Sequence, residues 1–345
     1  AYYLQADRYQ PDNPVIILSL DRVTFEIEKY DETLRYAERL REAGGYNGEA
    51  KLIVAEVELR KGNLARALGL FEEIKDEEGV PKLEVRKLMA RIYIENNETD
   101  KARRILEEAK ALDPMDLYTN YRLGFLYAEE GEVEKAIESL QRAADMGPDI
   151  AGTHLALASM FLRKGDVESA KESFRNAIRA EPENRDAVKS LADLYYEEGE
   201  LAEGIALLEP YYNDRDLDQD GKKTLGKFYY RYEDYDKALE IFKNMLKSEN
   251  DNPTIIRVIA EIEVGKGNFR SGVEYLTRLV EIDPGNFDNY IGLLLIAFDL
   301  AGDPSCPEEV STLSEEDGIE YLKKAEKLIN RDSADDNYFI GTIYR

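Results

Sequence analysis

The stretch YRLGFLYAEEGEVEKAIESLQRAADMGP, from Tyr121 to Pro148, decides the fold of this chain. Its apolar residues follow the spacing of two amphipathic helices, joined by a short turn at Gly131. The small residues Gly124 and Ala136, one in each predicted helix, allow the two helices to cross closely. A proline at the end stops the second helix, because proline cannot continue it.

The same pattern recurs from end to end with a period of 34 or 35 residues. The small residue of the second helix marks the period best, at Thr33, Ala67, Ala102, Ala136, Ala170, Gly204, Ala238 and Gly272. A fixed period of this length is typical of a solenoid, in which each repeat contacts only its neighbours. A solenoid usually offers binding surface, so the pattern says more about architecture than about a partner.

Each repeat is numbered so that the small residue above stands at position 20, and the repeats then start at Pro14, Gly48, Leu83, Leu117, Ala151, Arg185, Gln219 and Pro253. Position 8 is small in every repeat except the first, where it is Asp21. Large residues recur at positions 11 and 24, including Tyr93, Tyr127, Phe161, Tyr195 and Tyr229 and then Leu106, Leu140, Phe174, Leu208, Phe242 and Leu276. We expect them to fill the space between repeats.

These small, aromatic and proline positions together resemble the signature of the tetratricopeptide repeat family over nearly the whole chain. The tryptophan that is usual at position 4 of the family is absent, since the chain has no Trp. The resemblance implies an all-α fold, a right-handed superhelical solenoid of helix-turn-helix repeats. It also implies that the first helix of each repeat lines a concave groove.

We expect a single array over residues 1–345, with residues 1–13 as the end of a partial repeat and 14–286 as eight repeats. A ninth repeat at 287–333 carries an insertion of about twelve residues near 302–314, which includes Cys306, and 334–345 reads as the first helix of a further partial repeat. The insertion is either a tolerated surface loop or a segment that contacts a partner. Half-repeats at both ends predict a piece of a longer protein.

The composition excludes several classes of protein. Asp and Glu outnumber Lys and Arg by 72 to 46, and the net charge of −26 argues against nucleic acid or an anionic membrane as partner. Solubility of a long array explains the charge, with adaptation to salt as the alternative. The longest apolar run, Tyr290–Phe298, is far shorter than the roughly 20 residues of a membrane span, and no signal peptide follows Ala1. A soluble protein is expected, in the cytoplasm rather than the periplasm, although one cysteine does not fix the compartment.

Residues for catalysis or for a cofactor are scarce. His154 is the only histidine, and its place at position 4 of a repeat predicts a packing role. No nucleophile and base pair, no phosphate-binding glycine loop and no paired Cys/His spacing accompany it, so we expect no enzyme activity and no cofactor.

One acidic segment resembles the front of a calcium loop, with Asp216, Asp218 and Asp220 ahead of Gly221. The resemblance then fails, because Lys227 stands where such a loop needs a glutamate. The repeat period continues through the segment, so we interpret it as an acidic helix start favoured by the helix dipole, with weak calcium binding as the alternative.

Basic residues gather at the predicted groove positions despite the acidic composition. One group combines Lys87, Arg91 and Arg122 with Tyr118 and Tyr121; the other has Lys223, Lys227, Arg231 and Arg257 with Tyr230. Lys189 is a further candidate at a groove position. Such groups suit an extended peptide with carboxylates or phosphates. The alternative is that these side chains neutralise acids on neighbouring repeats. No three successive repeats match the family's carboxylate clamp, so a chaperone C-terminus is not expected.

The sequence therefore predicts a non-catalytic scaffold that binds a protein or peptide in the groove, and the basic groups favour a partner with acidic or phosphorylated segments. Two alternatives stay open. The array is the recruiting arm of a larger enzyme, such as a glycosyltransferase, or of a secretion machine, or it assembles with itself through its terminal repeats.

Overall fold

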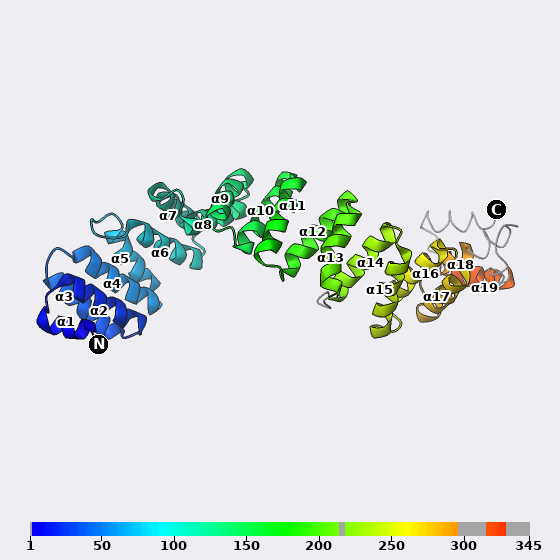
Figure 1. Ribbon diagram of the computed structural model, residues 1–345, viewed down its shortest axis with the longest axis horizontal. Helices are drawn as coiled ribbons and strands as arrows, with labels where there is room; N and C mark the ends of the chain where they lie inside the picture. The colour runs from blue at the N-terminus through cyan, green and yellow to red at the C-terminus, as the bar shows by residue number, and fades with distance from the viewer. Residues whose placement is uncertain (1, 214–217, 296–314, 329–345) are drawn as a thin grey trace. The chain divides into compact units, whose positions relative to one another are not determined.

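The computed structural model describes residues 2–213, 218–295 and 315–328, and it divides into two compact units, 1–187 and 188–345 (Figure 1). The described residues form nineteen helices and no strand, which confirms the predicted all-α fold built of helix pairs. The insertion near 302–314 with Cys306, and the last partial repeat at 334–345, lie outside these residues. The expectation of a single array therefore stays a prediction.

In the first unit, a single helix α1 precedes five helix pairs. Its helices are α1 (Tyr2–Tyr9), α2 (Pro14–Glu26), α3 (Tyr30–Glu42), α4 (Asn47–Arg60), α5 (Leu64–Ile74), α6 (Lys82–Glu95), α7 (Thr99–Leu112), α8 (Leu117–Glu130), α9 (Val133–Met146), α10 (Ala151–Lys164) and α11 (Val167–Ala180). Even-numbered helices from α2 to α10 are the first helices of their repeats, and each packs on the second helix that follows it.

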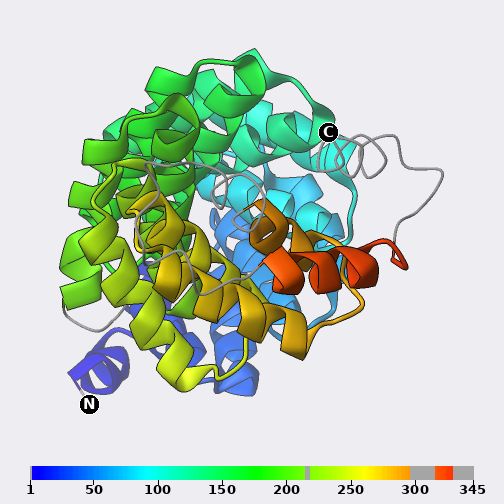
Figure 2. The same ribbon diagram turned by 90° about the vertical axis from the view of Figure 1, so that its right-hand side faces the viewer.

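In the second unit the same alternation continues. Its helices are α12 (Arg185–Glu198), which begins in the first unit, α13 (Leu201–Asn213), α14 (Gln219–Arg231), α15 (Tyr235–Ser248), α16 (Pro253–Gly265), α17 (Phe269–Ile282), α18 (Asp288–Leu295) and α19 (Glu315–Ala325). Figure 2 shows α17, α18 and α19 side by side, and each packs on the next.

Local capping explains where the helices begin and end. Asp116 caps α8 by accepting a hydrogen bond from the backbone N–H of Thr119 at 2.8 Å, and Asp218 caps α14 through the N–H of Gly221 at the same distance. These bonds satisfy N–H groups that have no partner inside the helix. Gly131 ends α8 with a φ of 81°, a left-handed conformation that glycine adopts without strain.

The small residues permit the close crossing that the sequence predicts. A Cβ atom added to Gly124 would lie 2.5 Å from Cγ of Leu140, and one added to Gly226 would lie 2.8 Å from the ring of Phe242. In the first unit a continuous buried core runs from Ala55 to Met160 through successive repeats. Burial of these faces, rather than helix propensity, stabilises the stack.

The aromatic residue at position 11 also joins one repeat to the preceding one. The Tyr127 hydroxyl donates to Oε1 of Glu107 at 3.1 Å, and the Tyr229 hydroxyl donates to Glu209 in the same way. Burial, reinforced by the glutamates, raises the pKa of both tyrosines to about 12. Each tyrosine therefore stays protonated and keeps donating over the neutral pH range.

Position 4, where the family's tryptophan is missing, holds polar groups that bond the end of the previous repeat. A side-chain atom of this residue lies 2.8 to 3.0 Å from the carbonyl oxygen of the proline six residues earlier, in the pairs Asn120–Pro114, His154–Pro148 and Tyr290–Pro284. His154 is buried, as predicted for a packing residue.

Candidate binding surface

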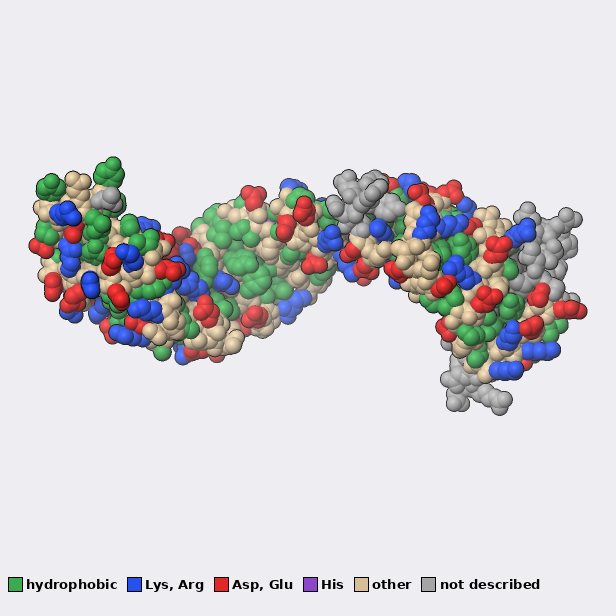
Figure 3. All heavy atoms as spheres, turned by 90° about the horizontal axis from the view of Figure 1, so that it is seen from below, with side chains coloured by type: hydrophobic (Ala, Val, Ile, Leu, Met, Phe, Trp, Pro, Cys, Tyr) green, Lys and Arg blue, Asp and Glu red, His purple; other side chains and the backbone are tan. Residues whose placement is uncertain are grey.

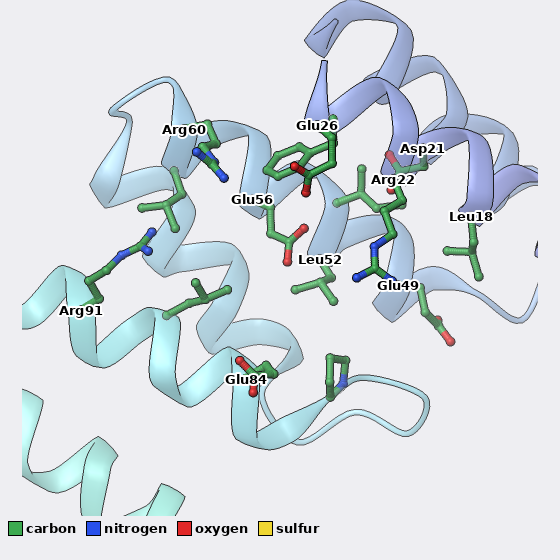
Figure 4. A pocket seen from close by; sticks show the side chains of 15 residues that line it. Leu18, Asp21, Arg22, Glu26, Glu49, Leu52, Glu56, Arg60, Glu84 and Arg91 are labelled. Carbon is green, nitrogen blue, oxygen red and sulfur yellow. The ribbon is translucent and has the colours of Figure 1, made fainter. Parts of the chain in front are cut away.

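An open pocket lies on the first helices of the first three repeats, α2, α4 and α6 (Figure 4). It has a volume of about 560 Å³ and is lined by Leu18, Asp21, Arg22, Phe25, Glu26, Glu49, Leu52, Ile53, Glu56, Leu59, Arg60, Pro81, Glu84, Leu88 and Arg91. The exposed surface of successive first helices is called the first-helix face below.

The charged residues at the base of this pocket are acidic. Asp21 is only 8% exposed, and its Oδ1 has no hydrogen-bond partner. Burial, together with the nearby charge of Glu56, raises the pKa of Asp21 to about 7. Burial also raises the pKa of Glu56, against the opposing pull of Arg60 and Arg22. Within the described part of the chain neither carboxylate forms an ion pair.

Arginines stand at the rim of the pocket. Arg22, Arg60 and Arg91 are all exposed. The guanidinium of Arg60 lies 5.4 Å from the centre of the Phe25 ring, and Arg91 lies 3.9 Å from the carboxylate of Glu95 on the same helix. The predicted groove residue Arg91 thus lies at this pocket. Asp21 and Glu56 were not predicted as residues of this site, although the acid at position 8 was the visible departure from the repeat pattern.

The rest of the first basic group lies on α6 and α8. Lys87 donates to Glu84 at 2.9 Å and to Asp116 of the next repeat at 3.1 Å. Burial opposes its charge, but these two hydrogen bonds raise the pKa of Lys87 above its usual value. For Lys87 the contacts are therefore those of the alternative interpretation, in which basic residues neutralise acids on neighbouring repeats.

Aromatic contacts hold the other members of this group. The guanidinium of Arg122 lies 5.3 Å from the ring centre of Tyr118 and 5.9 Å from that of Tyr121, which is the geometry of cation–π interactions. Tyr121 also packs on Phe125, with ring centres 4.8 Å apart. The Tyr118 hydroxyl and Nε of Arg122 are buried without a hydrogen-bond partner.

The second basic group belongs to the second unit. Lys189 pairs with Asp220 of the next repeat, so it also neutralises a neighbouring acid. Lys223 lines a smaller pocket of about 220 Å³ with residues of α14, α15 and α16. Lys227 is exposed one turn further along α14, and no ion pair within the described segments involves Lys223 or Lys227.

Arg231 and Arg257 have partners inside the protein. Arg231 lies 4.9 Å from the Tyr196 ring centre and donates to the backbone carbonyl of Tyr196 at 2.5 Å. Arg257 donates to Oδ1 of the buried Asn289 at 2.6 Å. Both bonds join one first helix to the neighbouring first helix.

The tyrosine of this group is at the surface. Tyr230 is 36% exposed, and its ring centre lies 5.9 Å from that of Tyr235. Burial of its inner part and the charge of Glu261 raise its pKa. Tyr230 therefore presents a neutral hydroxyl-bearing ring beside the exposed Lys227.

The acidic segment ahead of α14 has structural roles in the residues that are described. Asp218 is the cap of α14, and Asp220 is the partner of Lys189. Asp216 lies outside the described residues. Across residues 2–213, 218–295 and 315–328, no group of three or more His, Cys, Asp or Glu side chains is placed to hold a metal ion.

The surface carries charges of both signs. Figure 3 shows acidic and basic side chains interspersed over the face in view. None of the helices in the described ranges combines the length and apolar character needed to cross a membrane.

The paired helices and the repeated close contacts define a helical repeat protein. Models of the tetratricopeptide repeat match residues 24–79 and 155–220, residues 58–121 and 229–295, and residues 117–149. Because these matches together span most of the chain, it belongs to the tetratricopeptide repeat family, whose general role is protein binding. A comparison with curated proteins finds no significant match.

Several solved structures resemble the chain. YrrB, described as a repeat protein with an unusual peptide-binding site, is 16% identical; the match covers 55% of this chain and 97% of YrrB with a TM-score of 0.45. MamA from Desulfovibrio magneticus RS-1 is 22% identical over 50% of this chain and 97% of its own, with a TM-score of 0.42. A tetratricopeptide repeat protein from Parabacteroides merdae is 16% identical; the match covers 72% of this chain and 98% of that protein, with a TM-score of 0.43.

Proposed function

We propose that this chain is a non-catalytic scaffold that binds a protein or peptide on its first-helix face. The observation that carries the proposal is the open pocket on α2, α4 and α6, because three successive repeats contribute to one continuous depression. A depression that crosses several helices suits an extended chain better than a compact small molecule.

The second unit offers contacts of the same kind. Lys223 and Lys227 stand on α14 without an ion-pair partner among the described residues, and the exposed Tyr230 lies on the same helix. Long basic side chains beside an aromatic ring suit a carboxylate or phosphate on the bound partner. Arg231 and Arg257 are less available, because each already bonds a neighbouring repeat.

The test is a capture experiment with three forms of the chain as bait. The first is unaltered, the second carries Lys223→Glu and Lys227→Glu, and the third carries Lys247→Glu and Lys323→Glu on the second helices α15 and α19. The two variants change the net charge equally. We expect a partner that the first and third forms retain and the second loses. Equal retention by all three would exclude the α14 surface, and loss from the third alone would place binding on the second helices.

A further inference from the structure

The buried and half-buried charges of the pocket in the first unit are all acidic. Asp21 is buried and Glu49 and Glu56 are half-buried, whereas Arg22, Arg60 and Arg91 are all exposed. The deep titratable groups are therefore all carboxyl groups, and the arginines, on long flexible stems, lie at the rim together with Glu26 and Glu84. Figure 4 shows Glu56 near the middle of the space, with Asp21 and Arg22 on α2 beside it.

An unpaired carboxylate away from water is costly to the folded chain. Oδ1 of Asp21 is buried without a hydrogen-bond partner, and within the described residues neither Asp21 nor Glu56 has an ion pair that would offset the lost hydration. A cation brought in by a partner would offset part of this cost through its charge, since Asp21 and Glu56 lie close enough for the charge of Glu56 to raise the pKa of Asp21.

The walls of the pocket suit the stem of such a group. Leu18, Leu52, Leu59 and Leu88 line it and are half-buried, so each leaves part of an aliphatic side chain accessible. A lysine or arginine side chain combines a long apolar stem with a terminal charge, and it matches apolar walls around an acidic base.

We propose that this pocket receives a lysine or arginine side chain of the partner protein, with the charge at Glu56 and Asp21 and the stem against the leucines. The proposal rests on the proposed function and names the chemistry of one contact. It is opposite in sign to the acidic partner that the basic groups predict.

The test uses a library of random dodecapeptides displayed on phage and selected against the full chain. Peptides are then measured individually on the unaltered chain, on Asp21→Asn, on Glu56→Gln and on the control Glu134→Gln, which changes an exposed glutamate of the second helix α9. Circular dichroism verifies that the helix content of the four proteins is equal. Each selected peptide is also made with norleucine in place of its basic residues.

We expect selected peptides to contain lysine or arginine and to bind Glu56→Gln about tenfold more weakly, which corresponds to roughly 1.4 kcal/mol for one charge pair. Peptides with norleucine should bind the unaltered chain more weakly than the original peptides do. On Glu56→Gln the affinities of the two kinds of peptide should be similar. Asp21→Asn should weaken binding in the same direction, and Glu134→Gln should not.

Two results would overturn the inference. If peptides bind the first-helix face but are acidic or insensitive to Glu56→Gln, the cationic side chain is wrong and the proposed function stands. If no peptide is selected, or if Glu134→Gln alone weakens binding, both the pocket and the first-helix face are wrong as the binding site.

Discussion

At the scale of single residues, Asp21 shows how one departure from a repeat marks a special position. Position 8 is alanine or glycine in the next seven repeats, because the helices cross closely there. The first repeat has a carboxylate instead, and burial raises its pKa to about 7. The sequence displays this exception plainly, but it does not reveal that Glu56 lies nearby, since this depends on how α2 and α4 pack.

The raised pKa predicts a pH-dependent penalty. Asp21 stays protonated in the folded chain up to about pH 7 but only up to about pH 4 when unfolded, so its contribution to stability falls as the pH rises between these values. The free energy of unfolding of Asp21→Asn should therefore equal that of the unaltered chain at about pH 4. Above pH 7 it should be higher by up to about 4 kcal/mol. Urea unfolding followed by circular dichroism measures the difference, and a constant difference over this range would contradict the burial of the charge.

Turn residues give a second prediction at this scale. Glu233 has a φ of 65°, the left-handed conformation that Gly131 and Gly165 adopt at the same repeat position. A residue with a Cβ atom pays about 1 kcal/mol or more for that conformation. Glu233→Gly should raise the free energy of unfolding by about 1 kcal/mol, because glycine removes this strain. A matched change at an exposed helical site, Glu240→Gly, should lower it by a similar amount; stabilisation by both changes would show that the effect is not one of backbone conformation.

At the scale of elements, the first residue of each helix pair and its turn could be predicted closely, because the 34-residue period fixes both. The interaction partners of the predicted binding residues could not be predicted in this way. Arg231 was expected to face a ligand, yet it donates to the backbone carbonyl of Tyr196. Arg163, at the same position two repeats earlier, donates to the carbonyl of Ala128 at 2.8 Å. Such bonds depend on the distance between neighbouring helices, which a pattern of residue types does not contain.

Close packing between helices predicts a strong effect at Gly204. A Cβ atom there would lie 2.1 Å from the ring of Phe228, which is buried between α13 and α14. Gly204→Ala should therefore lower the free energy of unfolding by about 1–3 kcal/mol, since the ring has to move. At Gly69 of α5 an added Cβ meets no atom within 4 Å. Gly69→Ala should therefore raise the free energy of unfolding by up to about 1 kcal/mol. Equal effects of the two substitutions on thermal unfolding would contradict the packing described.

At the scale of the whole molecule, the separate roles of the charges become testable. Lys223→Glu with Lys227→Glu should weaken partner binding at least about tenfold without loss of helicity, because neither lysine holds the repeats together in the described structure. Lys189→Glu should instead reduce stability only slightly, since it breaks an exposed pair with Asp220. Isothermal titration with the captured partner and thermal unfolding separate the two effects, and unchanged affinity in the double variant would remove α14 from the binding surface.

Site-specific photo-crosslinking shows whether the first-helix face binds another chain. A benzoylphenylalanine is placed at Leu52 in the pocket, at Lys227 on α14, or at Glu134 on the second helix α9, and each form is irradiated with the captured partner or a selected peptide. We expect crosslinks from Leu52 or Lys227 and none from Glu134. Crosslinks from Glu134 alone would contradict this expectation and place the binding surface on the second helices.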